Sequence, residues 1–281
     1  MKKTIFAKSL IAVAALASAL FTGCQKKDAP EGNNKKELTY SRSAGPYSVL
    51  FEEAVQPILE AKGYSIKGFD YSNLSLADDA LNGGDVDFNV EQHSAYASSW
   101  NKGNGGDLTV LTPIPTVPAG LFSAKYKALE PVSGLENPKV AVPNDPSNTA
   151  RAYALLQKIG WITLKDGTDL SLATNADIAE NPYNIEFTEM SSANIPLVLD
   201  DFDYAVITGS IVYNAGIDPS SAIAQETVLP HLLLQLTVKE ANKDSQWAKD
   251  IVAAYHSKEL KEYLDKNNNG LWYIPEGYFN D

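Results

Sequence analysis

Hydrophobic positions after residue 37 follow two spacings that alternate along the chain. Short apolar runs between turn residues predict strands, and apolar residues three and four positions apart predict helices. The predicted strands are Leu38–Ser41, Ser65–Tyr71, Val86–Val90, Leu108–Thr116, Gly120–Ala124, Val140–Val142, Asn184–Glu189, Tyr204–Ile207 and Leu232–Val238. The predicted helices are Tyr47–Lys62, Ser75–Asn82, Gln92–Lys102, Pro146–Ile159, Trp247–His256 and Lys258–Lys266. Strands separated by helices of this length are typical of parallel α/β units, so we expect an α/β fold.

Two of the predicted helices carry specific backbone signals. Pro57 lies inside the first helix, where it removes one backbone hydrogen bond and should produce a kink. Asp145 is a good N-cap, and Pro146 is a good first helical residue. Gly160 follows as the residue that ends that helix. The helix that begins after Asp145 is therefore defined at both ends.

A second series of strands and helices begins near Lys139, after the first series has ended. The simplest architecture is two α/β lobes with the chain crossing between them. A cleft between two lobes is a common place for a small ligand to bind.

The N-terminus has the three zones of a secretion signal. Lys2, Lys3 and Lys8 form a positive start, and Ser9–Phe21 is an uncharged, mostly apolar run of 13 residues. A spanning helix needs about 20 such residues, so this run is too short to cross a membrane. We expect residues 1–23 to be a signal peptide.

Cys24 is the only cysteine, so no disulfide can form within the chain. Small residues precede it, and the segment resembles the bacterial lipobox, in which the thiol receives a lipid and the chain is cut before it. Phe21 departs from the leucine usual three residues earlier, and an ordinary cleaved signal with a chance cysteine is the competing interpretation. Residues 24–37 contain almost nothing apolar, which predicts a flexible tether to the extracytoplasmic face of a cell membrane.

Charge excludes some partners. The formal net charge is −12, and removal of the signal with its three lysines makes it −15. The acids are dispersed, which argues against nucleic acid and against binding of anionic lipid through the protein surface. The residues after the tether, in a chain that is 44% hydrophobic, suffice for a sizeable core in one or two domains.

Several separated segments resemble one family. Residues Val140–Arg151 read VAVPNDPSNTAR and are similar to the signature of the NlpA/MetQ family of methionine-binding lipoproteins. The similarity continues in order through Leu155–Gly160, Leu164–Gly167, Asp177–Pro182, Leu199–Asp201 and Ala205–Ile207. Earlier in the chain it includes Gly45–Pro46, Gly84–Asp87 and Gln92–His93. The resemblance covers nearly the whole chain after the signal.

The resemblance implies a two-lobed periplasmic-binding-protein fold, type II-like, with two interlobe crossovers. Residues 38–120 with 230–281 would form lobe 1, and residues 121–229 would form lobe 2. Family members deliver a solute to an ABC importer made of a permease and an ATPase. We therefore expect a monomer that binds methionine, another amino acid or a short peptide, with no cofactor and no metal.

Arg151 is the first candidate for ligand binding. It lies in the first turns of the helix that follows Asp145, where free N–H groups and partial positive charge gather. An arginine there can grip a carboxylate in a bidentate way, and the resemblance implies this role for an amino acid's α-carboxylate. The competing interpretation is an ion pair with a surface acid. Asn148, in the same block, is a second candidate.

Further candidates come from the first lobe. His93 follows a strand and opens a helix, and the resemblance places it in the pocket. Tyr96 lies three residues later on the same face and would form a pocket wall. Tyr47 and Tyr71 are weaker candidates, since core packing explains both equally well.

The chain departs from the family pattern at the amino and side-chain end of the ligand. Val90 and Glu91 stand where an aromatic pair is usual, and Thr208 replaces an asparagine. A second asparagine aligns with Leu234, beside Gln235, and Leu197 replaces an arginine. A lost asparagine leaves a ligand donor unpaired at about 1–3 kcal/mol. Glu91 is the candidate replacement, as a partner for an α-ammonium, although a lone glutamate more often faces solvent.

Three other functions remain open. An enzyme would need a site built from His93, His231 or His256, but no nucleophile elbow and no zinc-protease motif is present. Residues 265–276 satisfy the calcium-loop pattern, but Pro275 and the short remainder leave no exit helix, and an Asn/Gly helix stop before a terminal strand, Leu271–Ile274, explains them as well. A surface lipoprotein or antigen without a transport role fits the lipid site alone.

Overall fold

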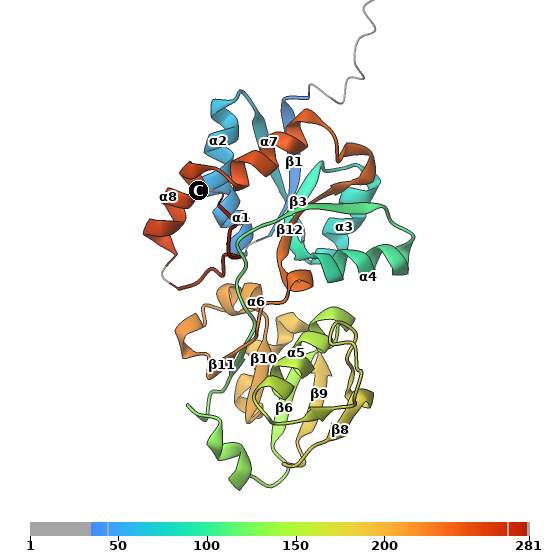
Figure 1. The fold of residues 1–281 in the computed structure, drawn as a ribbon, viewed down its shortest axis with the longest axis vertical. Coiled ribbons are helices and arrows are strands. Elements are labelled where there is room, and N and C mark those ends of the chain that lie inside the picture. Colours follow the sequence, from blue (N-terminus) through green and yellow to red (C-terminus); the bar gives the residue numbers. More distant parts are fainter. Residues whose placement is uncertain (1–34, 44, 269, 280–281) are drawn as a thin grey trace, which may run out of the picture. The chain divides into compact units, whose positions relative to one another are not determined.

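A computed structural model describes residues 35–43, 45–268 and 270–279. The signal peptide, Cys24 and most of the tether, predicted above, lie outside these residues. The compact unit Gly32–Asp281 contains two five-stranded sheets with helices packed on them (Figure 1). The expected α/β fold with two sheets is confirmed.

The first sheet has the strand order β2-β1-β3-β12-β4. Its strands are β1 (Glu37–Arg42), β2 (Ser65–Asp70), β3 (Phe88–His93), β4 (Leu108–Pro113) and β12 (Leu234–Lys239). Strands β1, β2 and β3 pair in parallel, as predicted. Strand β12 pairs antiparallel with both β3 and β4, so the expectation of purely parallel units is wrong here.

The second sheet has the order β11-β5-β10-β6-β9. Its strands are β5 (Gly120–Phe122), β6 (Lys139–Pro143), β9 (Glu186–Met190), β10 (Tyr204–Ile207) and β11 (Ala224–Gln225). Strands β6, β9 and β10 are parallel, whereas β5 is antiparallel to β10 and β11. A separate two-stranded ribbon pairs β7 (Thr163–Leu164) with β8 (Ile178–Glu180).

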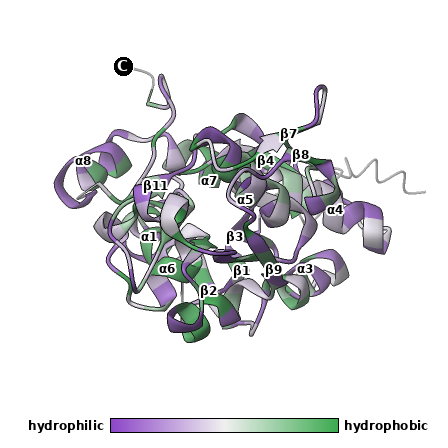
Figure 2. Cartoon of the chain, turned by 90° about the horizontal axis from the view of Figure 1, so that it is seen from below, coloured by the Kyte–Doolittle hydropathy of each residue, from purple (hydrophilic) through white to green (hydrophobic). Residues whose placement is uncertain are grey.

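Eight α-helices accompany the sheets in the part of the chain that the structure describes. They are α1 (Pro46–Leu50), α2 (Gln56–Ala61), α3 (Leu74–Gly83), α4 (Ser94–Asn104), α5 (Pro146–Lys158), α6 (Gly209–Asn214), α7 (Gln246–Tyr255) and α8 (Lys258–Asn267). In Figure 2 helix α8 carries hydrophilic as well as hydrophobic residues, whereas α4 is mostly hydrophilic. None of the described helices is both long and apolar enough to cross a bilayer.

The chain passes between the two sheets twice. The first connection runs from the end of β4 to β5, residues 113–120, and the second runs from β11 to β12, residues 225–234. Gly209, at the start of α6, lies against the first connection, because a Cβ there would stand 2.4 Å from the carbonyl oxygen of Val117. The two crossings that the resemblance implied are present.

Some predicted boundaries are wrong for identifiable reasons. Gln92 and His93 belong to β3 and not to the following helix, because they pair with Gln235 and Leu234 of β12. The predicted terminal strand is limited to one bridge between Tyr273 and Thr116. Pairing partners distant in sequence decide both cases, and local spacing does not contain them.

The helix predicted over Tyr47–Lys62 forms, but with a distortion in its middle. A π-helical turn, Phe51–Val55, joins α1 to α2, and Pro57 occupies the first turn of α2. A proline cannot donate to the carbonyl four residues earlier, so the backbone widens before it. The predicted kink therefore takes the form of a π turn.

A buried carboxyl lies under β3. Asp78 of α3 is fully buried and accepts hydrogen bonds from the side-chain amides of Asn89 (2.9 Å) and Gln92 (2.7 Å). Burial raises the pKa of Asp78 to about 7, and the two amide donors only partly oppose this. Its second oxygen and the side-chain oxygen of Gln92 have no partner among the described atoms. A proton on Asp78 supplies a donor to this acceptor-rich cluster.

We predict that Asp78→Asn stabilises the protein at pH 8. The native pKa is raised above the unfolded value, so wild type gains stability as the pH falls from 8 to 5, and the asparagine variant lacks this gain. The variant should be more stable by about 1–3 kcal/mol at pH 8, with a smaller difference at pH 5, in urea unfolding. The exposed neighbour Asp79 gives the control Asp79→Asn. A difference that does not change with pH contradicts the assignment.

Candidate functional site

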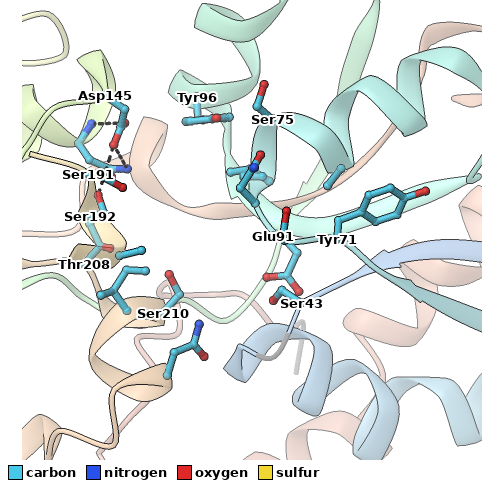
Figure 3. A pocket seen from close by; sticks show the side chains of 18 of the residues that line it. Ser43, Tyr71, Ser75, Glu91, Tyr96, Asp145, Ser191, Ser192, Thr208 and Ser210 are labelled. Atoms are coloured by element: carbon cyan, nitrogen blue, oxygen red, sulfur yellow. Dashed lines mark hydrogen bonds between the residues drawn. The ribbon is translucent and has the colours of Figure 1, made fainter. Parts of the chain in front are cut away.

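A cavity of about 660 Å³ is lined by elements of both sheets (Figure 3). Serine and asparagine are the commonest residues in its wall, which also has apolar surface from residues such as Leu74 and Ile211. From the first sheet and its helices the lining is Ser41, Arg42, Ser43, Tyr71, Ser72, Asn73, Leu74, Ser75, Ala77, Glu91 and Tyr96. From the second it is Asn144, Asp145, Asn148, Ser191, Ser192, Ala193, Thr208, Ser210, Ile211 and Asn214.

A smaller cavity of about 70 Å³ shares part of this lining and lies deeper, against buried residues. The residues common to both are Leu74, Glu91, Tyr96, Asn148, Thr208 and Ser210. Tyr47, His93 and Arg151 line the smaller of these two cavities and not the larger one. Arg151 also lines a third cavity of about 170 Å³, together with Glu226.

The structure thus gathers eight of the nine ligand-binding candidates around these two cavities. The ninth, Gln235, is buried in β12, where its amide nitrogen donates to the carbonyl oxygen of Leu233 (3.0 Å). It is not among the lining residues of either cavity.

His93 is the N-cap of α4, and this role selects its tautomer. Its Nδ1 accepts a hydrogen bond from the backbone N–H of Tyr96 (3.1 Å), so that nitrogen carries no proton. Burial, together with the charge of Arg151, lowers the pKa of His93 to about 3. The neutral ring therefore carries its proton on Nε2, which points to Asn148 Oδ1 at 3.3 Å. His93 is a hydrogen-bond donor at the cavity wall.

Asn148 is held in one orientation by its own helix cap. Asp145 caps α5 by accepting from the backbone N–H of Asn148 (3.0 Å) and from its side-chain nitrogen (3.1 Å). The amide oxygen therefore turns the other way, toward His93 Nε2 and Arg151 Nη1, the latter at 3.4 Å. This oxygen faces two donors that a ligand carboxylate would also use.

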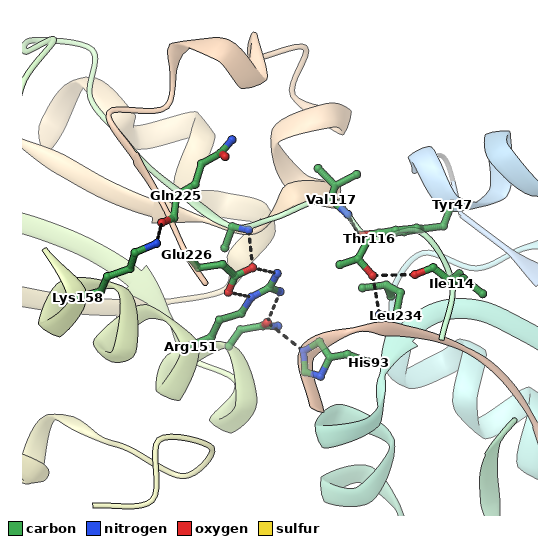
Figure 4. Close-up of polar contacts among 12 residues, drawn as sticks. Tyr47, His93, Ile114, Thr116, Val117, Arg151, Lys158, Gln225, Glu226 and Leu234 are labelled. Carbon is green, nitrogen blue, oxygen red and sulfur yellow. Dashed lines mark hydrogen bonds and ion pairs between the residues drawn. The ribbon is translucent and has the colours of Figure 1, made fainter. Parts of the chain in front are cut away.

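Arg151 forms a buried ion pair with Glu226 (Figure 4). Its Nε and Nη2 both donate to the Glu226 carboxylate, and both side chains are 4% exposed. Burial alone disfavours the charged guanidinium, but the charge of Glu226 outweighs it and raises the pKa of Arg151. The expectation that the bidentate face of Arg151 is open to a ligand is therefore corrected. Nη1 is the nitrogen that does not bond to Glu226, and it lies 3.4 Å from Asn148 Oδ1, another lining residue of the smaller cavity.

Glu226 was not among the predicted site residues. It follows the short strand β11, within the second connection between the sheets, and its Oε1 also accepts from the backbone N–H of Ala119 (2.8 Å) in the first connection. Nothing local in its sequence marks it as buried. The Glu226 carboxylate is buried here because it pairs with Arg151, which is 75 residues away in the sequence.

The tyrosine candidates differ in exposure and contact. Tyr47 is buried, packs edge-on against Trp272, and accepts a hydrogen bond from the backbone N–H of Val117 (3.0 Å). Tyr96 stands edge-on to the ring of His93, and Tyr71 is half-buried on the wall of the larger cavity. Tyr47 therefore combines core packing with a position at the smaller cavity.

Thr208 and Glu91 face each other across the larger cavity (Figure 3). Thr208 is the N-cap residue of α6, but its side chain forms no cap hydrogen bond. Glu91 Oε1 accepts from the Ser48 hydroxyl at 2.6 Å. Thr208 and Glu91 both line this cavity.

Residues 42–275 match the family model described as NlpA lipoprotein. The chain belongs to the NlpA lipoprotein family. The match covers both sheets apart from residues 37–41 of β1, and it includes every candidate residue except Cys24. The resemblance inferred from the separated segments is confirmed.

NlpA relatives cover almost the whole chain. The D-methionine-binding lipoprotein MetQ of Salmonella typhi is 32% identical over 271 residues, which cover 94% of this chain and 96% of the relative. A nutrient binding protein from Burkholderia cenocepacia, solved bound to methionine, is 36% identical with a TM-score of 0.77, covering 84% of this chain and 98% of that one. The substrate-binding protein of a methionine transporter from Streptococcus pneumoniae is 28% identical with a TM-score of 0.75, covering 85% and 95%. These relatives are named as binding proteins.

We predict that Arg151→Ala lowers the free energy of unfolding by about 3–5 kcal/mol, because it leaves the Glu226 charge buried without a partner. The double variant Arg151→Ala, Glu226→Ala should cost less than the sum of the two single variants in urea unfolding. Lys258→Ala is the control, because Lys258 pairs with Glu262 at the surface and the loss should stay below about 1 kcal/mol. Additive single costs at Arg151 and Glu226 contradict the coupling.

Proposed function

We propose that the protein is the solute-binding component of an ABC importer and captures an amino acid, methionine or a related amino acid or short peptide, in the cavity between the two sheets. The supporting observation is that one cavity, lined by both sheets, holds converging hydrogen-bond donors in a chain whose 36% identical relative was solved with methionine. Arg151 Nη1 and His93 Nε2 are the donors for the α-carboxylate.

The donors act together because neither is fully satisfied within the protein. Arg151 Nη1 and His93 Nε2 both reach the single oxygen of Asn148, at 3.4 Å and 3.3 Å, which are long contacts for such bonds. A ligand carboxylate brings two charged oxygens and can accept from both donors at shorter distances. His93 lies on β3 and Asn148 on α5, so a ligand held here contacts both lobes.

We also propose the membrane attachment and the partners. Cys24 would carry the lipid, residues 24–37 would form the tether, and the protein would stay on the extracytoplasmic face beside a permease and its ATPase. Residues 38–120 with 230–281 would move as one lobe and residues 121–229 as the other, with the two connections as hinges. A tether raises the effective concentration of the receptor at the permease.

Native mass spectrometry of the full chain, purified in detergent, tests the proposal. We expect a retained α-amino acid or short peptide of unchanged mass, released after unfolding. Addition of that ligand to the refolded protein should raise the melting temperature, by the equivalent of about 2.7 kcal/mol at a hundred times its Kd. Recovery of a chemically altered ligand favours an enzyme. No retained ligand and no shift with any of the twenty amino acids favours a surface lipoprotein without a transport role.

We predict that His93→Asn weakens amino-acid binding about 10-fold in calorimetric titration. Asparagine retains the N-cap of α4, but its shorter side chain does not place a donor at Asn148 Oδ1. His231→Asn is the matched control, because His231 is not among the lining residues of either cavity. Equal affinities for the two variants would remove His93 from the carboxylate site.

A further inference from the structure

The charges that line the two cavities are unequally paired. Arg42 is held by Glu52 (2.7 Å) and Asp70 (3.0 Å), and Arg151 is held by Glu226. Glu91 forms no ion pair with any residue in ranges 35–43, 45–268 and 270–279. Both arginines of the two cavities therefore have anionic partners. Among the described residues, the lining carboxylates Glu91 and Asp145 form no ion pair, but Asp145 is used as the N-cap of α5.

Glu91 is built into the wall by hydroxyl groups and not by a cation. Its Oε1 accepts from the Ser48 hydroxyl at 2.6 Å, and the Ser48 side chain is itself fully buried. Burial raises the pKa of Glu91, and hydrogen bonds from Ser48 and Ser43 lower it in part. A carboxylate in such surroundings is stabilised by a cation that arrives with the ligand.

The second oxygen of Glu91 lies close to two other acceptor oxygens beside Gly45. A Cβ on Gly45 would lie 3.8 Å from Glu91 Oε2, 3.7 Å from Asn214 Oδ1 and 3.0 Å from Ser43 Oγ. Three acceptor oxygens thus lie near one another beside Gly45, and an ammonium group, which has three N–H donors, can bond to acceptors grouped in this way. Glu91 belongs to β3 and Asn214 ends α6, so the acceptors come from both lobes.

This group of acceptors is joined to the proposed carboxylate site by a shared wall. Glu91 lines the smaller cavity together with His93 and Arg151, so one small ligand can reach all three. The larger cavity also presents hydroxyl groups from Ser72, Ser75, Ser191 and Ser192, beside apolar surface from residues such as Leu74 and Ile211. An apolar side chain would leave those groups without partners when the cavity closes.

We propose that Glu91, with Asn214 and Ser43, is an ammonium seat, and that the ligand is an amino acid or short peptide with a free primary ammonium and a hydrogen-bonding side chain. The inference rests on the proposed function, since it assigns the other end of the same bound ligand. It explains how the chain binds an ammonium at a position where Thr208 and Leu234 offer no amide oxygen.

The test compares each ligand with its N-acetyl derivative, by calorimetric titration of the full chain in detergent. The probes are L-glutamine, L-lysine and L-methionine, the dipeptide serylglycine, and their N-acetyl forms. We expect a polar probe to bind more tightly than L-methionine, and acetylation, which removes the ammonium, to weaken binding about 10- to 100-fold. If an amino acid binds more tightly than serylglycine, the ligand class is a free amino acid. If serylglycine binds more tightly, the ligand class is a short peptide.

Glu91→Gln should weaken binding of the free amines to a similar extent and leave the N-acetyl forms almost unchanged. Asn214→Ala, at an exposed position, should give a smaller loss and serves if the glutamine variant does not fold. Glu262→Gln, on the surface of α8, is the control.

The ammonium seat is overturned if free amines bind wild type, Glu91→Gln and Asn214→Ala equally well, a result that leaves the proposed function intact. If L-methionine binds most tightly, the inference that the ligand has a hydrogen-bonding side chain is wrong. If neither these probes nor any of the twenty amino acids binds wild type, the proposed function itself is removed.

Discussion

The buried pair of Arg151 and Glu226 connects the parts of the molecule that have to work together. Arg151 belongs to α5 of the second sheet, and Glu226 lies in the second connection between the sheets. Through Ala119 the same carboxylate also holds the first connection. One charge thus joins a cavity-lining helix to both crossings of the chain. Because a buried charge cannot be left alone, the three segments keep their relation to each other.

Local spacing was sufficient for most of the elements. The cap at Asp145 and the stop at Gly160 placed α5 almost to the residue, since both signals act within one turn. The end of β3 was misplaced, because Gln92 and His93 join the sheet through β12, which is more than 140 residues away in sequence. The antiparallel insertion of β12 leaves no trace in the spacing of either strand.

In the candidate site, too, some features could be predicted from local sequence and others depend on distant partners. A family motif identifies Arg151 and Asn148, and an aligned departure draws attention to Glu91. The pairing of Arg151 could not be predicted, because Glu226 has no pattern of its own and is buried only by the fold. The tautomer of His93 was equally hidden, since it depends on which nitrogen accepts from the first turn of α4. Sequence identifies such groups, but the donors and acceptors that remain free are decided by tertiary contacts.

The position of β12 also sets the order in which the chain can fold. Every strand of the second sheet lies between residues 120 and 225, so that sheet has all its partners once this continuous segment exists. In the first sheet, β12 stands between β3 and β4 and is the strand that joins them. Until residues 234–239 arrive, β3 has an open edge and β4 has no neighbour in the sheet. The lobe that begins the chain is therefore completed last, and the unfinished edges of β3 and β4 are the surface that a chaperone would have to cover.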